Sequence, residues 1–141
     1  MPEIFSYPAS PHLATQIDGR EIDFKKIENA TQQLTENYSC VLLEGAGGLM
    51  VPLTTELLTI DYVAEKKFPV ILVSSGRLGS INHTLLSLEA LKQRGLDLYA
   101  LAYNLNDESQ DAIISKDTAE FLKNYLIKHF PKAKWIDIPV I

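Results

Sequence analysis

The sequence has little cysteine, no long apolar run and no excess of positive charge. Its single cysteine, Cys40, can form neither an internal disulfide nor a cysteine metal cluster. No apolar run is long enough to span a bilayer, and no basic segment followed by an apolar stretch marks a secretory signal. The net charge of −5 argues against a nucleic-acid partner, because phosphate binding needs a basic face. We therefore expect a cytoplasmic protein that binds neither membranes nor nucleic acids.

The composition fits one globular domain. Of the 141 residues, 46% are hydrophobic and 22% are charged, a balance that allows a core of useful size. This length suits one compact domain and is too short for two ordinary ones. Because the sequence contains no internal repeat and no low-complexity segment, we expect residues 1–141 to belong to a single domain.

Stretches with helical periodicity alternate with short apolar runs along the chain. We predict helices over residues 24–37, 59–67, 80–94 and 116–129, and strands over residues 40–43, 69–73, 98–103 and 134–138. Cys40 is expected to be a small core residue where the first strand starts. Continuous apolar strands that alternate with helices indicate an α/β fold, with a parallel sheet and helices on both faces. Ligands bind beyond the carboxyl ends of such strands, so functional residues are expected there.

The first candidate site follows the apolar run at residues 40–43. Glu44 ends this run, and the glycine-rich residues 45–48 come directly after it. A carboxylate here suits Mg²⁺, with phosphates supplying other ligands, and glycine-rich amides suit phosphate oxygens. A tight turn with a solvated glutamate explains the pattern equally well.

The second candidate site is the loop at residues 74–83, which follows a predicted strand and opens a helix. Ser80 could cap this helix, and Asn82 could donate to a carboxylate. Helix N-termini attract anions through their unpaired N–H groups and the helix dipole. On these residues alone, an ordinary turn between a strand and a capped helix is the favoured interpretation.

The third candidate site combines Asn104, at the end of the predicted strand 98–103, with residues 138–141. An asparagine side chain can both donate to and accept from the edge of a base. A proline-containing apolar segment can form a wall beside a flat ring. On these residues alone, a strand-ending asparagine and an ordinary tail are the favoured interpretation.

These residues do not include a phosphate-binding loop. The pattern G-x-x-x-x-G-K-[ST] does not occur, and no lysine directly follows the glycines of residues 45–48. His12, His83 and His129 are too scattered to suggest a metal site. The residues by themselves therefore indicate half of a nucleotide site.

Two motifs, E-G-A-G-G at residues 44–48 and L-G-S-I-N-H at residues 78–83, occur together with S-P-H at residues 10–12, Asn104 and I-P at residues 138–139. In order and spacing, these segments resemble the dethiobiotin synthetase family. The resemblance implies a P-loop NTPase-like parallel α/β fold, a homodimer, and an ATP- and Mg²⁺-dependent ligase of biotin biosynthesis. Such an enzyme carboxylates 7,8-diaminononanoate with CO₂ and closes the ring of dethiobiotin, releasing ADP and phosphate.

The resemblance also implies roles for individual residues. Glu44 would hold Mg²⁺, and Asn104 would hydrogen-bond to adenine. The nucleotide would contact Glu44, Gly45, Ala46, Gly47, Asn104, Pro139, Val140 and Ile141. The tail carboxylate of the substrate would meet Leu78, Gly79, Ser80, Ile81 and Asn82 of the neighbouring subunit, so that each site is completed across the dimer interface.

The first strand of the family, its phosphate-binding loop and its lysines would all precede Met1. We therefore expect a partial α/β domain that is incomplete at its N-terminus, with no catalytic residue within this chain and no activity alone. Leu105 stands where many relatives carry Asp, and Phe121 where some carry a Tyr that contacts the substrate carboxylate.

Two alternative functions stay open. One is a non-catalytic dimerisation or binding module derived from this fold, and the other is a cobyrinate amidase-type synthetase, which residues 78–83 disfavour.

Overall fold

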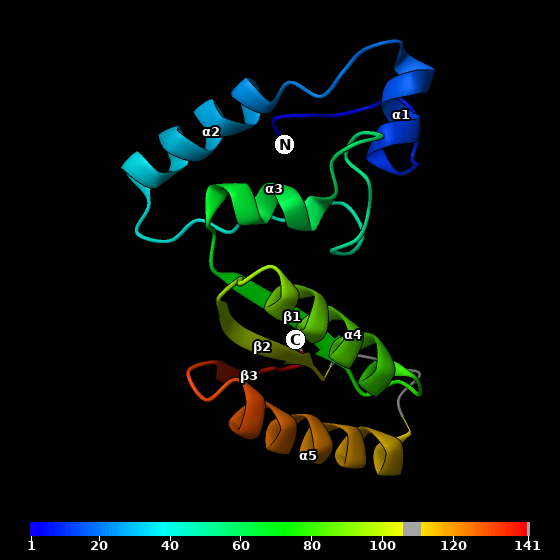
Figure 1. Cartoon of the computed structure of the whole chain (residues 1–141), viewed down its shortest axis with the longest axis vertical. Coiled ribbons are helices and arrows are strands. Elements are labelled where there is room, and N and C mark those ends of the chain that lie inside the picture. The colour runs from blue at the N-terminus through cyan, green and yellow to red at the C-terminus, as the bar shows by residue number, and fades with distance from the viewer. Residues whose placement is uncertain (106–110, 141) are drawn as a thin grey trace. The chain divides into compact units, whose positions relative to one another are not determined.

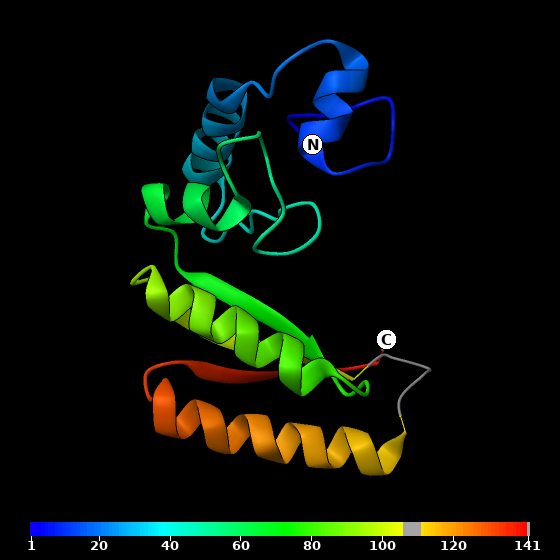
Figure 2. The ribbon, with the colours of Figure 1, turned by 45° about the vertical axis from the view of Figure 1, so that its right-hand side comes forward.

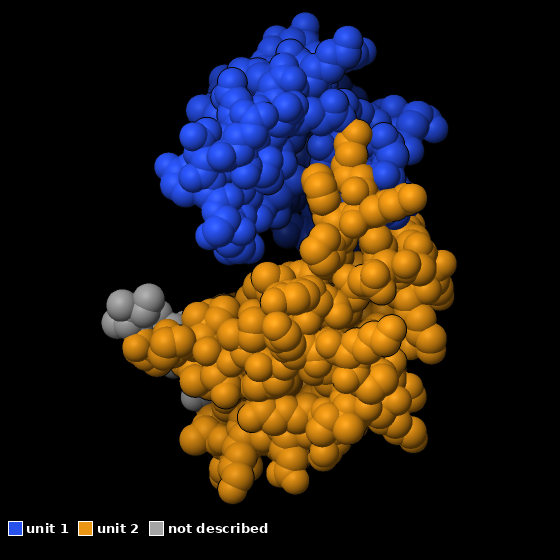
Figure 3. Space-filling view, turned by 90° about the vertical axis from the view of Figure 1, so that its left-hand side faces the viewer, with its two compact units in different colours: residues 1–65 blue, residues 66–141 orange. Residues whose placement is uncertain are grey.

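The computed structural model describes residues 1–105 and 111–140 of the chain. The chain divides into two compact units: unit 1 is Met1–Glu65, and unit 2 begins at Lys66 (Figure 3). Among the described residues, no helix is both long and apolar enough to cross a bilayer.

Unit 1 contains α1 (Pro11–Asp18), α2 (Phe24–Asn37) and all but the last residue of α3 (Thr59–Lys66), which are joined by irregular segments (Figure 1). α2 has its predicted bounds, and the carboxylate of Asp23 caps it by accepting a 3.0 Å hydrogen bond from the Lys26 amide. α3 ends one residue before its predicted end. Lys67 adopts a left-handed φ of 54°, which the helix cannot continue through.

The first helix, α1, is absent from the sequence-based prediction. Its 8 residues are too few to show a clear apolar periodicity. Both of its ends nevertheless carry helix signals. Pro11 lies in the first turn, and Gly19 follows the last turn in a left-handed conformation with φ of 63°. A proline and a glycine at this spacing were the signal that could have revealed the helix.

The prediction of a buried strand at residues 40–43 is wrong. These residues form an irregular segment, and no described strand pairs with them. Cys40 is exposed instead of buried, and the side chains of Leu42 and Leu43 are 77% and 46% exposed. An apolar run becomes a strand only where a neighbouring strand accepts and donates its backbone hydrogen bonds. Local composition cannot show whether that neighbour is present.

Unit 2 alternates β1 (Val70–Ser75), α4 (Ser80–Gln93), β2 (Leu98–Asn104), α5 (Ala112–His129) and β3 (Lys134–Ile138). The strands form a parallel sheet in the order β1-β2-β3, which confirms the predicted α/β class and parallel pairing. α5 begins four residues before its predicted start at residue 116. The Asp111 carboxylate caps it there by accepting from the amides of Ile113 and Ile114 at 2.8 and 3.2 Å.

Within unit 2, α4 and α5 pack on the same face of the sheet (Figure 2). Ser74 of β1 and Tyr103 of β2 are register partners, so their side chains share a face. The hydroxyl of Ser74 lies 2.7 Å from that of Thr84 on α4, and the Tyr103 hydroxyl donates to the Ser115 carbonyl of α5 at 2.8 Å. Leucines fill the space between the sheet and the helices. Those buried there are Leu88, Leu91, Leu101, Leu122 and Leu126.

Candidate functional site

The glycine turn, residues 44–48 of unit 1, presents a carboxylate and several backbone amides to solvent. All five of its residues are exposed, including Glu44. Gly47 has a φ of 83°, a conformation that side chains other than glycine rarely adopt. The end of the turn is closed by a hydrogen bond from the Val51 amide to the Gly48 carbonyl at 3.1 Å. The turn is therefore open to solvent, and its backbone amides are not shielded by side chains at its glycines.

The donor set at the glycine turn suits Mg²⁺ only together with a phosphate ligand. Among the described residues, no group of three or more His, Cys, Asp or Glu side chains could hold a metal ion by itself. Mg²⁺ usually keeps several waters and takes one or two carboxylates plus the phosphates of a substrate. The exposed carboxylate of Glu44 fits that pattern as a single protein ligand.

The loop between β1 and α4 brings Gly79 to the start of the helix. Gly79 is the N-cap of α4, with φ of 94° and ψ of −14°, and no side chain caps the helix. The prediction that Ser80 caps α4 is therefore wrong. Ser80 is the first helical residue, and its hydroxyl lies 3.3 Å from that of Ser75. Because the N-cap is a glycine, it has no side chain of its own to bond to the first amides of the helix.

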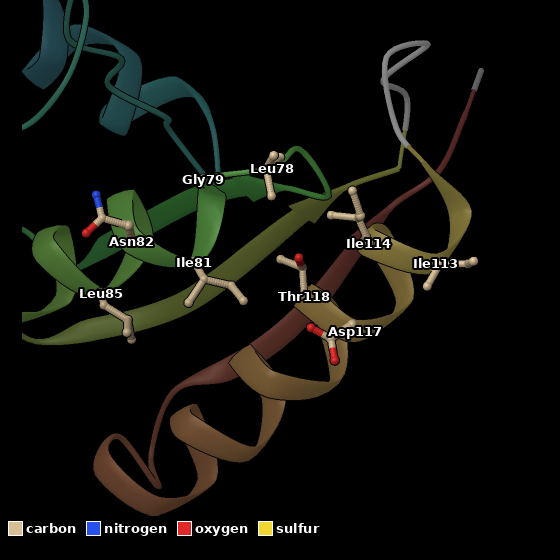
Figure 4. Close-up of a pocket in the computed structure, with 9 residues that line it drawn as sticks. All are labelled: Leu78, Gly79, Ile81, Asn82, Leu85, Ile113, Ile114, Asp117 and Thr118. Atoms are coloured by element: carbon tan, nitrogen blue, oxygen red, sulfur yellow. The ribbon is translucent and has the colours of Figure 1, made fainter.

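A groove of about 670 Å³ lies between the first turns of α4 and α5 (Figure 4). Four of the five residues predicted to bind the substrate line it: Leu78, Gly79, Ile81 and Asn82. Ser80 does not. The remaining lining residues are Leu85, Ile113, Ile114, Asp117 and Thr118. Ile113 and Ile114 were missed because the predicted helix started at residue 116, although Asp111 followed by apolar residues was a usable N-cap signal.

The wall of this groove is mostly aliphatic, with a few polar groups at its edges. Leu78 and Ile113 are 86% and 81% exposed, so the groove is open to solvent on both sides. Its polar side chains are the carboxamide of Asn82, the carboxylate of Asp117 and the hydroxyl of Thr118 (Figure 4). Such a surface suits an alkyl chain that ends in a polar group.

The third predicted site lies at the carboxyl ends of β2 and β3. Asn104 and Ile138 are register partners, and the Leu105 amide donates to the Ile138 carbonyl at 3.0 Å. This pairing brings the Asn104 end of β2 beside the start of the segment formed by Pro139 and Val140, which are both exposed. Ile141 lies outside the described residues. Glycine-turn residues thus belong to unit 1, and the other two predicted sites belong to unit 2.

Comparison with known proteins supports the resemblance found in the sequence. Residues 2–136 match a family described as an AAA domain. The ATP-dependent dethiobiotin synthetase BioD 2 of Pasteurella multocida is 52% identical over 130 residues, which cover 92% of this chain and 61% of that protein. The ATP-dependent dethiobiotin synthetase BioD of Chlorobaculum tepidum is 50% identical over 138 residues, covering 97% of this chain and 57% of that protein. The chain therefore spans about three-fifths of the length of these curated relatives.

Proposed function

This chain belongs to the AAA domain family, and from that premise we propose that it is part of an ATP-dependent dethiobiotin synthetase. In the reaction, one amine of 7,8-diaminononanoate takes up CO₂ as a carbamate. ATP phosphorylates the carbamate, and the second amine attacks its carbon, closes the cyclic urea and releases phosphate. The products are dethiobiotin, ADP and phosphate. Similarity to the named synthetases supports this proposal.

The observation that carries the proposal is the aliphatic groove between α4 and α5. The substrate is a long alkyl chain with a carboxylate at one end and two neighbouring amines at the other. Ile81, Leu85 and Ile114 offer the chain an apolar wall. The uncapped N-terminus of α4 offers backbone N–H groups and a favourable dipole to the carboxylate. We infer that the segment 78–82 binds the substrate tail, with Asn82 as an additional hydrogen-bond donor.

The glycine turn is proposed to bind the phosphates of ATP. The amides of Gly45, Ala46 and Gly47 would donate to phosphate oxygens, and Glu44 would hold Mg²⁺. Mg²⁺ held there would help neutralise the negative charge of the phosphates during phosphoryl transfer. Exposure of Glu44 and the left-handed conformation of Gly47 support this assignment, because both keep the turn accessible to an anion.

The carboxyl ends of β2 and β3 are proposed to bind the adenine ring. The carboxamide of Asn104 would read the edge of the base, and Pro139, Val140 and Ile141 would lie along the ring. The register pairing of Asn104 with Ile138 supports this proposal, since Pro139 directly follows Ile138 at the end of β3.

Other parts of the enzyme are proposed to come from outside these residues. The phosphate-binding loop and the lysines of the family are not found within the 141-residue sequence. We propose that a segment of the same enzyme supplies them, and that the cytoplasmic enzyme is a homodimer in which the 78–82 segment serves the neighbouring active site. A homodimer would explain why the groove of unit 2 opens to solvent at Leu78 and Ile113.

A chimeric enzyme tests the proposed function. In it, this chain replaces the matching part of the Pasteurella multocida relative, to which it is 52% identical. The chimera is expected to form dethiobiotin from diaminononanoate, bicarbonate and Mg-ATP. Glu44→Gln should lower the rate at least about tenfold by weakening the metal site. Glu56→Gln is the matched control, because Glu56 is also exposed in unit 1 but lies outside the glycine turn. A folded chimera that forms no dethiobiotin contradicts the proposal.

A further inference from the structure

The backbone of the glycine turn touches two β-branched side chains. A Cβ atom placed on Gly47 would lie 2.8 Å from Cγ2 of Val51, and one placed on Gly45 would lie 3.1 Å from Cγ2 of Thr59. Contacts below 3.0 Å are essentially never seen for real Cβ atoms. The glycines therefore allow the turn to lie directly against Val51 and Thr59, and these two side chains limit how far the turn can move in their direction.

Thr59 also fixes the position of Val51 through hydrogen bonds. Its backbone amide and its side-chain hydroxyl both donate to the Val51 carbonyl, at 2.9 and 3.0 Å. The Val51 amide in turn donates to the Gly48 carbonyl at 3.1 Å. A continuous chain of hydrogen bonds thus runs from Thr59 through Val51 to the last residue of the glycine turn.

The start of α3 gives this chain of hydrogen bonds a firm anchor. Thr59 is the first residue of the helix, and the side chain of the next residue, Ile60, is completely buried. The Ile60 amide donates to the Leu49 carbonyl at 2.9 Å, which adds a second connection beside the turn. A turn with three glycines in four residues has more backbone freedom than an ordinary turn. An external anchor is what can hold it in one shape.

We propose that Thr59 is a positioning residue for the nucleotide-binding turn: its hydroxyl, acting through Val51, holds the amides and carboxylate of residues 44–48 in the shape that binds a Mg²⁺–nucleoside triphosphate. This inference rests on the proposed function of the glycine turn. In this proposal Thr59 acts through Val51 and not by contact with a reacting atom. By holding the turn in one shape before phosphate binds, Thr59 reduces the loss of conformational entropy on binding.

The first test compares the 141-residue chain with single-residue variants of it and needs no ligand. Thr59→Val removes the hydroxyl and keeps the shape of the side chain, whereas Thr59→Ser keeps the hydroxyl. In NMR spectra, Thr59→Val is expected to shift the amide resonances of Gly47 and Gly48, and Thr59→Ser is expected to leave them near their wild-type positions. Thr54→Val is the matched control, since the Thr54 hydroxyl accepts from the Glu56 and Leu57 amides, which lie outside the turn. If Thr59→Val does not fold, Thr59→Ala replaces it.

The second test measures binding in the chimeric enzyme. Thr59→Val should raise the KM for Mg-ATP about fivefold, the effect of losing one hydrogen bond, and should leave the KM for diaminononanoate unchanged. Thr59→Ser should restore the wild-type value. If Thr59→Val lowers the melting temperature but leaves both the glycine resonances and the KM for Mg-ATP unchanged, Thr59 is a structural residue only and the inference is wrong. If the wild-type chimera does not use Mg-ATP, the proposed function fails, and the glycine resonances alone decide the role of Thr59.

Discussion

Asp117 of α5 and Asn82 of α4 line the same groove, so one carboxylate and one carboxamide border a mostly aliphatic wall (Figure 4). Asp117 is the single charged side chain among the residues that line the groove. A negative charge at this place repels an anionic ligand tail and attracts a cationic one. If the groove binds the substrate tail as proposed, Asp117 is expected to affect which end group it accepts.

Removing that charge should strengthen binding of the substrate tail. In the chimeric enzyme, Asp117→Asn is expected to lower the KM for diaminononanoate about two- to fivefold, as expected for one partly screened charge pair at a protein surface. Glu120→Gln, an exposed position on the same helix outside the groove, should leave the KM unchanged. An increase in KM for Asp117→Asn would mean that the carboxylate contributes to binding and that the tail does not lie beside it.

Acid should weaken unit 1 through its N-terminal ion pairs. Arg20 donates to a carboxylate oxygen of Glu3 at 2.6 Å, and Lys26 lies 3.3 Å from the other oxygen. The hydrogen bond from Arg20 lowers the pKa of Glu3, with a smaller contribution from Lys26, and partial burial opposes both. Because the folded-state pKa is depressed, this stabilisation is present above the ordinary pKa of glutamate, about 4.3, and is lost as the pH falls further.

Thermal unfolding at pH 7 and pH 3 measures this effect. Protonation of Asp18 at low pH should also destabilise unit 1, since hydrogen bonds from the Ser6 hydroxyl and amide lower the pKa of Asp18. Arg20→Met should reduce the loss of stability between the two pH values. Lys25→Met removes the same charge from an exposed position on α2 and should leave the pH dependence intact. Equal pH dependence in wild type and Arg20→Met would show that the ion pair is not the cause.

The central strand should be far more sensitive to truncation than the edge strand. Leu101 of β2 is completely buried, so Leu101→Ala is expected to reduce the free energy of unfolding by about 2–5 kcal/mol. The side chain of Val73 on β1 is 61% exposed, so Val73→Ala should cost no more than about 0.5 kcal/mol. Urea unfolding of the two variants gives both values. A large loss for Val73→Ala would mean that this face of the sheet is covered in solution.

Local sequence patterns predicted the elements of unit 2 well, because their periodicity and composition agree with the contacts they make. α2 was also predicted at its correct bounds, since Asp23 is a strong N-cap and the helix is long. The run at residues 40–43 has the composition of a buried strand, yet it lacks a described partner, and pairing is a long-range property. The prediction that Ser80 caps α4 failed for a local reason: Gly79, in a left-handed conformation, already occupies the N-cap position.

The candidate sites were predictable only in part. The ends of predicted strands pointed to Glu44, to residues 78–82 and to Asn104, because the carboxyl ends of parallel strands are where ligands bind. For Glu44 the predicted strand, residues 40–43, does not form. The α5 side of the groove could not be predicted, since it depends on how two helices pack across a sheet. The contact of Thr59 with the glycine turn was equally hidden, because thirteen residues of irregular chain separate Thr59 from Gly45 and no periodic pattern links them.

The measurement that tests the central claim most directly follows the carbon atom of CO₂. The chimeric enzyme is incubated with diaminononanoate, Mg-ATP and ¹³C-labelled bicarbonate, and the product is analysed by mass spectrometry. The account predicts dethiobiotin with ¹³C in its ureido carbonyl, formed in equal amount to ADP. Release of ADP without labelled dethiobiotin from a folded chimera would contradict the assignment of this chain to a dethiobiotin synthetase.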